Sequence, residues 1–457
     1  MHGSATDSLV KKTTKKKNSN RQWFDWHSWL GTVTGLFLFV IFWSGSFAVF
    51  SYELDWLMNP AQHVTPIGEQ ASFSEIYDHL KNKHPTFKFG SIDKGPYPNF
   101  AIQVLGETTD GQSIRLFVDP YKLATTGTVE WLNIQRFFRE FHRGFFALPL
   151  GDYVVCFFAV PLLASLISGL FFYKRWWKRF LEVKTGKGKK VFWSSLHKTA
   201  GLWSLWFVLI IGITGGWYFF EHIRGDTIDG KFAYVDTGAS AVNRLPKLIE
   251  GPERLPFSTL MEIAAKARPS LEINSVSISR GGYFYIEGQD DNFLVRDRAN
   301  KMFINPYSGE IVYNQTPDKL STYWHWTDIA DPLHFGDFGG MITKTIWFIF
   351  GIILSGLTLS GAWLHLKRLQ KDPKNRNYWR GSITAGFIGV FIFLSNVLIE
   401  LAYYISENAI AASSMLSASA GRSWAFSGSA IFLYSWTIIT LIICIVWFYS
   451  LLRAVKA

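Results

Sequence analysis

Residues 30–51 read LGTVTGLFLFVIFWSGSFAVFS, an apolar run without a single charged side chain. A helix needs about 20 such residues to cross the hydrocarbon core of a bilayer, so this stretch predicts a membrane span. Five further runs of the same character follow along the chain. They lie at 153–173, 202–220, 342–364, 382–404 and 424–452. The sequence therefore predicts an integral membrane protein, mainly α-helical, with six transmembrane helices in contact with the lipid bilayer.

The composition agrees with a chain that lies largely in a membrane. Of its 457 residues, 48% are hydrophobic and 17% aromatic, whereas 18% are charged. A soluble domain has about 25% charged residues, and so much apolar surface excludes intrinsic disorder. The two cysteines, Cys156 and Cys444, lie in separate apolar runs. This placement excludes a disulfide scaffold, a cysteine-rich metal site and covalent haem attachment.

The net charge of +11 is concentrated in segments that adjoin the spans. Lysine and arginine are dense in the tail 1–29 and in the connections 174–201 and 365–381. Because basic residues mark the cytoplasmic side of membrane proteins, we expect both termini and these two loops in the cytoplasm. The first span is longer than the apolar region of a signal peptide, which favours a retained anchor. We expect no nucleic-acid partner, since each basic run abuts a span.

The two long segments, 52–150 and 221–340, are expected on the opposite, extracytoplasmic side. The chain contains no Walker motif and no glycine-rich dinucleotide motif after a strand. The cytoplasmic loops are also too short to fold a flavin or nicotinamide domain. These observations exclude such domains, and ATP-driven transport, within this chain.

The two long segments resemble each other. Both contain a stretch that begins Phe-Ser and reaches a proline twelve residues later, at 73–85 and at 257–269. This pattern predicts a short helix that the proline ends. Farther along come Val-Asp-Pro at 118–120 and Ile-Asn-Pro at 304–306, each typical of a strand, a turn and a second strand. We therefore predict two copies of one small α/β unit.

The duplication extends to the membrane, where four histidines occupy matched positions. His27 and His197 each open a span in the pattern H-x-x-x-G, and His142 and His334 each precede a span in the pattern H-x-G. A pseudo-two-fold axis along the membrane normal would place His27 opposite His197 and His142 opposite His334. Facing imidazoles are axial ligands for a haem iron, and a nearby glycine lets a flat macrocycle approach the helix. The architecture is then two copies of span, outer unit and span, followed by two extra helices.

Zinc binding and a purely structural role are the alternatives for these four histidines. Zinc prefers three or four close protein ligands, which two histidines on each membrane face do not supply, so haem is favoured. His222 and His365 have no matched histidine and serve as reserve ligands. Haem propionates need cations nearby, with interfacial anchoring as the alternative role of such residues. The candidates are Arg139 and Arg143 on the outer side, and Lys198 and Arg21 on the inner side.

On these motifs the chain resembles the PepSY-associated transmembrane proteins, which include iron-regulated membrane proteins and ferric-siderophore reductases of the bacterial inner membrane. The resemblance covers about residues 20–370. It rests on Trp-His-Ser-Trp-Leu-Gly at 26–31, Phe-His-Arg at 141–143, Leu-His-Lys-Thr-Ala-Gly at 196–201 and Pro-Leu-His-Phe-Gly at 332–336. It implies PepSY-like outer units, two b-type haems and electron transfer from quinol or a cytosolic reductase to a periplasmic ferric siderophore or other iron chelate. The two last spans lie outside the resemblance.

Two other functions fit the same topology. One is a non-enzymatic sensor whose outer units bind a peptidase or another envelope protein. The other is an accessory subunit of a transporter, built on parallel repeats. Only the haem hypothesis predicts a coloured protein. For the chelate, we expect the aromatic stretch 323–326 (Tyr-Trp-His-Trp) to form one wall of a pocket, with ordinary aromatic packing as the alternative.

Overall fold

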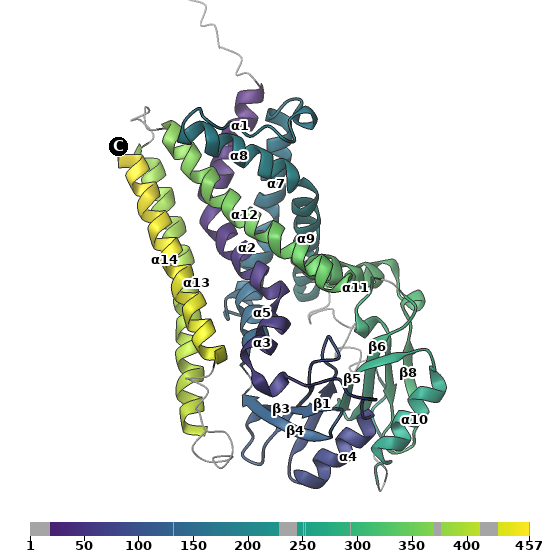
Figure 1. Ribbon diagram of the computed structural model, residues 1–457. Coiled ribbons are helices and arrows are strands. Elements are labelled where there is room, and N and C mark those ends of the chain that lie inside the picture. Colours follow the sequence, from purple (N-terminus) through teal and green to yellow (C-terminus); the bar gives the residue numbers. More distant parts are fainter. Residues whose placement is uncertain are drawn as a thin grey trace, which may run out of the picture.

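The computed structural model shows a bundle of long helices with one β-sheet at one end (Figure 1). It describes residues 19–130, 132–227, 245–249, 251, 253–292, 294–369, 376–411 and 428–456. We call the end of the bundle next to the sheet the sheet side, and the opposite end the far side. Residues 1–18 of the predicted basic tail and residues 370–375 of the predicted loop lie outside the described residues.

Five helices are long and apolar enough to cross a membrane, and they lie where the sequence predicts spans. The first is formed by α6 and α7 together. The bounds are α6 (Leu150–Phe157), α7 (Ala159–Phe172), α9 (Leu205–Thr227), α12 (Gly340–Leu369), α13 (Arg376–Ala411) and α14 (Gly428–Lys456). The outward faces of α13 and α14 are apolar and exposed, as at Ile392 and Ile442, which fits contact with lipid.

The first predicted span is not one straight helix. It consists of α1 (Ser19–Val33) and α2 (Gly35–Val49), which meet at an angle of 64° and form a sixth span only if they are taken together. The bend falls at Thr34, whose hydroxyl donates a hydrogen bond to the carbonyl oxygen of Leu30 at 2.8 Å. Such back-bonding, next to a glycine, bends helices. The sequence predicts one continuous span over residues 30–51, and this prediction is wrong at Thr34, where the helix is broken.

The two segments that were expected to form separate α/β units share a single antiparallel sheet. Its strand order is β4-β3-β2-β1-β5-β6-β7-β8. The bounds are β1 (Lys88–Asp93), β2 (Ile102–Glu107), β3 (Ser113–Asp119), β4 (Ala124–Glu130), β5 (Glu272–Arg280), β6 (Tyr283–Gln289), β7 (Lys301–Ile304) and β8 (Ile311–Gln315). The halves join where Ile92 of β1 lies opposite Val276 of β5. This pairing satisfies backbone groups that two separate sheets would each expose at an edge.

Helices α4 (Phe73–Lys83) and α10 (Phe257–Ala267) cover one face of this sheet, and their apolar side chains share one core with it. Tyr77 of α4 stacks on Phe257 of α10, with ring centroids 4.5 Å apart. The two proline turns also match, because the side chains of Asp119 and Asn305 each accept the backbone N–H two residues later. Each half of the sheet thus has one covering helix followed by four strands, in the same order along the chain.

Among the described residues, three shorter helices connect the sheet and the spans, and a fourth joins two spans. The first three are α3 (Ser51–Met58), α5 (Ile134–Gly144) and α11 (Thr322–Phe335), and the fourth, α8 (Lys189–Trp203), lies between α7 and α9. Helices α5 and α11 follow the last strand of each half of the sheet and precede α6 and α12. Because they occupy equivalent places in the repeat, they bring equivalent side chains to the sheet side of the bundle.

Candidate functional site: two pairs of partly buried histidines

The structure brings together His142, near the end of α5, and His334, near the end of α11. Their ring centroids lie 6.2 Å apart and the ring planes are tilted by 38°. The Nδ1 atom of His142 lies 3.1 Å from the hydroxyl of Ser44 in α2, and that of His334 lies 2.8 Å from the hydroxyl of Thr214 in α9. We call these two histidines the sheet-side pair. Each ring is held in a fixed orientation by a hydroxyl from a neighbouring helix.

The other two histidines, His27 of α1 and His197 of α8, form the far-side pair. The Nδ1 atom of His27 lies 2.9 Å from the carbonyl oxygen of Ser165 in α7, and that of His197 lies 3.0 Å from the hydroxyl of Ser360 in α12. Burial and, next, the charge of His27 lower the pKa of His197 to about 3. Among the described residues, a ring contact joins His142 to His334 but none joins His27 to His197, and the ring of His27 meets that of Phe172 at 5.2 Å instead.

The hydrogen bonds fit one tautomer of all four histidines. A carbonyl oxygen can only accept, so Nδ1 of His27 donates to Ser165. The hydroxyls of Ser44, Thr214 and Ser360 each lie within hydrogen-bond distance of a carbonyl of their own helix. A hydroxyl that donates to this carbonyl accepts from the histidine Nδ1–H. In this form each imidazole has its lone pair on Nε2, which is the atom that a metal binds.

Three of the four rings lie against a glycine of the helix that holds them. A Cβ atom added at Gly45 would lie 2.7 Å from Cε1 of His142, and one at Gly361 would lie 3.0 Å from Cε1 of His197. At Gly169 the distance to His27 is 3.5 Å. A larger side chain at the first two positions would displace the imidazole, because protein interiors leave no room for overlap.

The glycines that motivated the haem prediction play a different part. Gly31 and Gly201, in the two H-x-x-x-G patterns, have no heavy atom within 4 Å of an added Cβ. They do not touch the histidine rings. They leave the helix surface open next to His27 and His197, where a flat group has room to approach. The glycines that touch the rings were missed. Two of them are visible as a repeat in the sequence. Gly169 follows His142 by 27 residues, and Gly361 follows His334 by the same 27 residues.

The centroid distance of the sheet-side pair, 6.2 Å, is close to that of two imidazoles bound to one metal ion. With metal–nitrogen bonds of about 2 Å, two opposed imidazoles have ring centroids about 6 Å apart, which matches the spacing of His142 and His334. Burial lowers the pKa of His142 to about 4 and, with the charge of His142 as a second cause, that of His334 to about 3. Both rings are therefore neutral at pH 7, as ligands must be.

The two reserve histidines lie elsewhere. His365 of α12 is held like the other four, because its Nδ1 lies 2.8 Å from the hydroxyl of Thr32, and its ring meets Trp379 at 4.7 Å. His222 lies near the sheet-side end of α9, where its ring centroid is 5.7 Å from that of Tyr153. It is therefore at the opposite end of the span from His197 and not a substitute for it.

The cations predicted to meet propionates have other contacts or are exposed. Arg143 makes a bidentate ion pair with Asp152, at 3.1 and 2.9 Å. The ammonium of Lys198 lies 5.6 Å from the ring centroid of Tyr173. The side chains of Arg139 and Arg21 are exposed to solvent. A propionate role for these four residues stays a prediction, and for Arg143 it requires exchange of its carboxylate partner.

A buried network of charges anchors α11 to the second half of the sheet. The guanidinium of Arg298 pairs with Asp328 at 2.7 Å and with Asp331 at 3.0 Å. The hydroxyl of Tyr218 in α9 donates to Asp331 at 2.7 Å. Burial raises the pKa of the Asp331 carboxyl, but the two neighbouring arginines outweigh it and hold the pKa below its ordinary value. Asp331 lies one turn before His334, so this network fixes the helix that carries a site histidine.

Replacing Arg298 with methionine is expected to lower the free energy of unfolding by about 3 kcal/mol, because the buried carboxylate of Asp328 loses its ion-pair partner and Asp331 keeps only Arg296. The matched control is Lys184→Met, which breaks a solvent-exposed pair with Glu182 and should cost at most about 1 kcal/mol. Thermal unfolding in detergent compares the two variants, and equal losses of stability would contradict this role of Arg298.

The stabilisation by Asp331 should be present above pH 4 and decrease as the pH falls further, since its folded-state pKa lies below the unfolded value of about 3.9.

A cavity of about 730 Å³ lies beside α11, where both halves of the sheet meet the bundle. Its lining includes Pro96 and Asn274 from the two halves, and Asp337 from the turn after α11. None of residues 323–326 lines it. Tyr323 instead packs on Trp217 at 5.0 Å and beneath the guanidinium of Arg224 at 4.5 Å. The aromatic stretch therefore packs against α9 and is not a wall of this cavity.

The apolar spans define a multi-pass membrane protein, and its core carries two pairs of partly buried histidines at equivalent places. The family model of the PepSY-associated TM region matches residues 24–368, and the chain belongs to this family. The match contains all four matched histidines and ends before α13. In a comparison with curated proteins, no relative matches the chain.

Proposed function

We propose that the protein is a di-haem b oxidoreductase of the bacterial inner membrane, which passes electrons across the membrane to a ferric chelate in the periplasm. Ferric siderophores are the candidate chelates, and quinol or a cytosolic reductase is the candidate donor. The observation that carries this proposal is the matched set of four histidines. Each directs Nδ1–H to a neighbouring helix and keeps its Nε2 lone pair for a ligand.

In this proposal His142 and His334 hold one haem and His27 and His197 hold the other. A haem bound between such a pair supplies reversible one-electron transfer. The serine and threonine partners of Nδ1 fix each ring plane and increase the basicity of Nε2, as outer-shell partners of metal-bound histidines do. All four rings are partly buried, which limits the access of water to the bonds that orient them.

Zinc explains the same histidines less well. Among the residues that the structure describes, no group of three or more His, Cys, Asp or Glu side chains is arranged to hold a metal ion. Zinc would need such a third or fourth protein ligand, whereas in haem the porphyrin supplies the remaining ligands and the protein adds two.

The cavity beside α11 is where we place the ferric chelate. It adjoins Pro332, two residues before His334, so a chelate bound there would lie close to the sheet-side pair. Four aspartates line it, and its two arginines, Arg296 and Arg298, already pair with carboxylates. This balance favours neutral or cationic chelates over anionic ones.

An absorbance spectrum of the protein purified from haem-replete cells tests the proposal. We expect a Soret band, α and β bands after reduction by dithionite, and two haems per chain by the pyridine haemochrome assay. Addition of a neutral ferric trihydroxamate to the reduced protein should reoxidise it. A colourless preparation would refute the proposal and favour the sensor or the transport subunit.

A further inference from the structure

We propose that α13 and α14, which lie beyond the family match, are a positioning element that holds His142 by clamping α5 against α2. The inference rests on the proposed function in one respect only, which is that haem is the group bound by His142. The clamp itself rests on packing, on one hydrogen bond and on the backbone conformation after His142.

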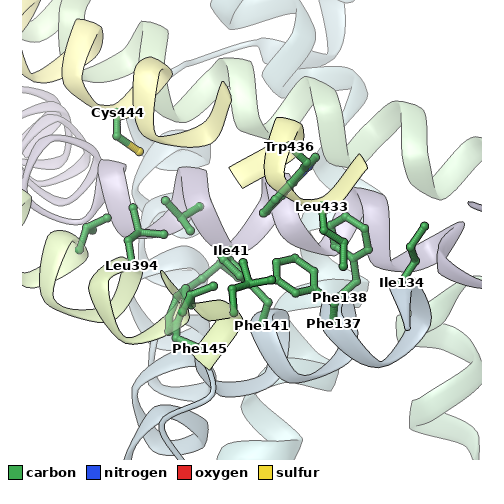
Figure 2. Packing of buried hydrophobic residues seen from close by; sticks show 14 of the residues in the cluster. Ile41, Ile134, Phe137, Phe138, Phe141, Phe145, Leu394, Leu433, Trp436 and Cys444 are labelled. Carbon is green, nitrogen blue, oxygen red and sulfur yellow. The ribbon is translucent and has the colours of Figure 1, made fainter. Parts of the chain in front are cut away.

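The packing forms one continuous apolar cluster of α2, α5, α13 and α14 (Figure 2). Phe137, Phe138 and Phe141 of α5 are completely buried in it. All three rings contact Trp436 of α14. We call α13 and α14 together the hairpin, and α5 depends on it for part of its burial. The hairpin and α2 contribute Leu394, Val397, Leu433, Trp436, Phe39, Val40 and Ile41.

Trp436 of α14 lies at the centre of this cluster and is 4% exposed. Its ring centroid is 5.1 Å from that of Phe141, nearly perpendicular to it, and 6.4 Å from that of Trp43, nearly parallel to it. Phe141 directly precedes His142, and Trp43 directly precedes Ser44, the hydrogen-bond partner of His142. One side chain of the hairpin therefore contacts the neighbours of both groups in the His142–Ser44 hydrogen bond.

Helix α13 holds the backbone that follows His142. The Nδ2 atom of Asn396 donates to the carbonyl oxygen of Phe145 at 2.9 Å. Phe145 and Phe146 have φ angles of 52° and 58°, a left-handed conformation that bulky residues adopt only where the surroundings impose it. The hydrogen bond from Asn396 supplies such a constraint within the membrane region.

The second copy anchors its histidine differently. His334 lies on α11, which is held by the ion pairs of Arg298 and by Tyr218. The first copy has an apolar clamp at the place where the second copy has a polar one. The hairpin contacts α1 and α12 through other residues, such as Trp379 and Leu451. A change at Trp436 should therefore act on His142 and spare the far-side pair, which provides an internal control in the same molecule.

The test compares three variants of the full-length protein in detergent. Trp436→Ala removes the clamp. Trp436→Phe keeps an aromatic ring and loses only an indole N–H that has no hydrogen-bond acceptor among the described residues. Ile442→Ala changes a lipid-facing residue of the same helix and is the control. The measurements are the haem count, the low-spin ferric EPR signals and the potential of each haem, and hydrogen–deuterium exchange of α5.

The EPR signal that is lost in His142→Ala identifies the haem of the sheet-side pair. In Trp436→Ala we expect this signal to weaken or to shift in g value, and the potential of this haem to change. The signal of the other haem should be unchanged. Exchange in α5 should become faster, and exchange in α11 should not. Trp436→Phe should restore both, and Ile442→Ala should match the wild type. Wild-type signals and wild-type α5 exchange in Trp436→Ala would overturn the inference. If the wild-type protein contained no haem, the proposed function would be refuted. The comparison of α5 hydrogen–deuterium exchange between Trp436→Ala and the wild type would then still test the clamp.

Discussion

Replacing His334 with alanine is expected to remove one of two haems and to leave the other with its wild-type spectrum. The reason is geometric, because His142 alone supplies one axial ligand while its mate at a centroid distance of 6.2 Å is lost. Replacing His197 with alanine should remove the other haem in the same way. The pyridine haemochrome value should fall from two to one per chain in each variant, and to zero when the two changes are combined.

The control for the His334 variant lies on the same helix. His325 of α11 belongs to the aromatic stretch that packs against α9 and does not line the cavity, so His325→Ala should keep both haems. Two haems in His334→Ala or in His197→Ala would show that the ligand assignment is wrong. Attention would then turn to the reserve residues, above all to His365, whose Nδ1 is held by Thr32 like those of the other four.

The second large effect is expected at Gly45 of α2. A Cβ atom there would lie 2.7 Å from Cε1 of His142 and 3.2 Å from its Nδ1, so Gly45→Ala should push the imidazole away from Ser44. Alanine gains up to about 1 kcal/mol over glycine in a helix, whereas overpacking in a well-packed core costs about 1–3 kcal/mol. The clash should therefore prevail, and we expect loss or a strong spectral shift of the haem that His334→Ala also removes.

Gly35→Ala is the matched control for this glycine. Gly35 lies in the same helix, and its added Cβ would meet its nearest neighbour, the carbonyl oxygen of Thr358, at 3.5 Å, an ordinary contact. Both haems should remain, with unchanged or slightly increased thermal stability. If Gly45→Ala kept both haems with wild-type spectra, the close approach of His142 to this helix would have no functional meaning.

The sequence alone was sufficient for the features that depend on local pattern and on repetition. Five of the six apolar runs fall on candidate spans and the first falls on the bent pair α1 and α2, because the length of an apolar run is a property of neighbouring residues. The pairing of His142 with His334 followed from their equivalent places in two copies, since a repeat related by pseudo-symmetry brings equivalent residues together. The short helices 73–83 and 257–267 followed from their Phe-Ser starts and the prolines beyond them.

The tertiary structure decided what depends on residues far apart in the chain. The partner of His142 is 98 residues away, that of His334 is 120 away, and that of His197 is 163 away. A serine in an apolar helix looks the same in sequence whether or not it faces a histidine. The joining of β1 to β5 and the contact of Trp436 with α5 are equally non-local. Such contacts arise only when whole helices and strands pack, because packing selects one arrangement among many that the same local patterns permit.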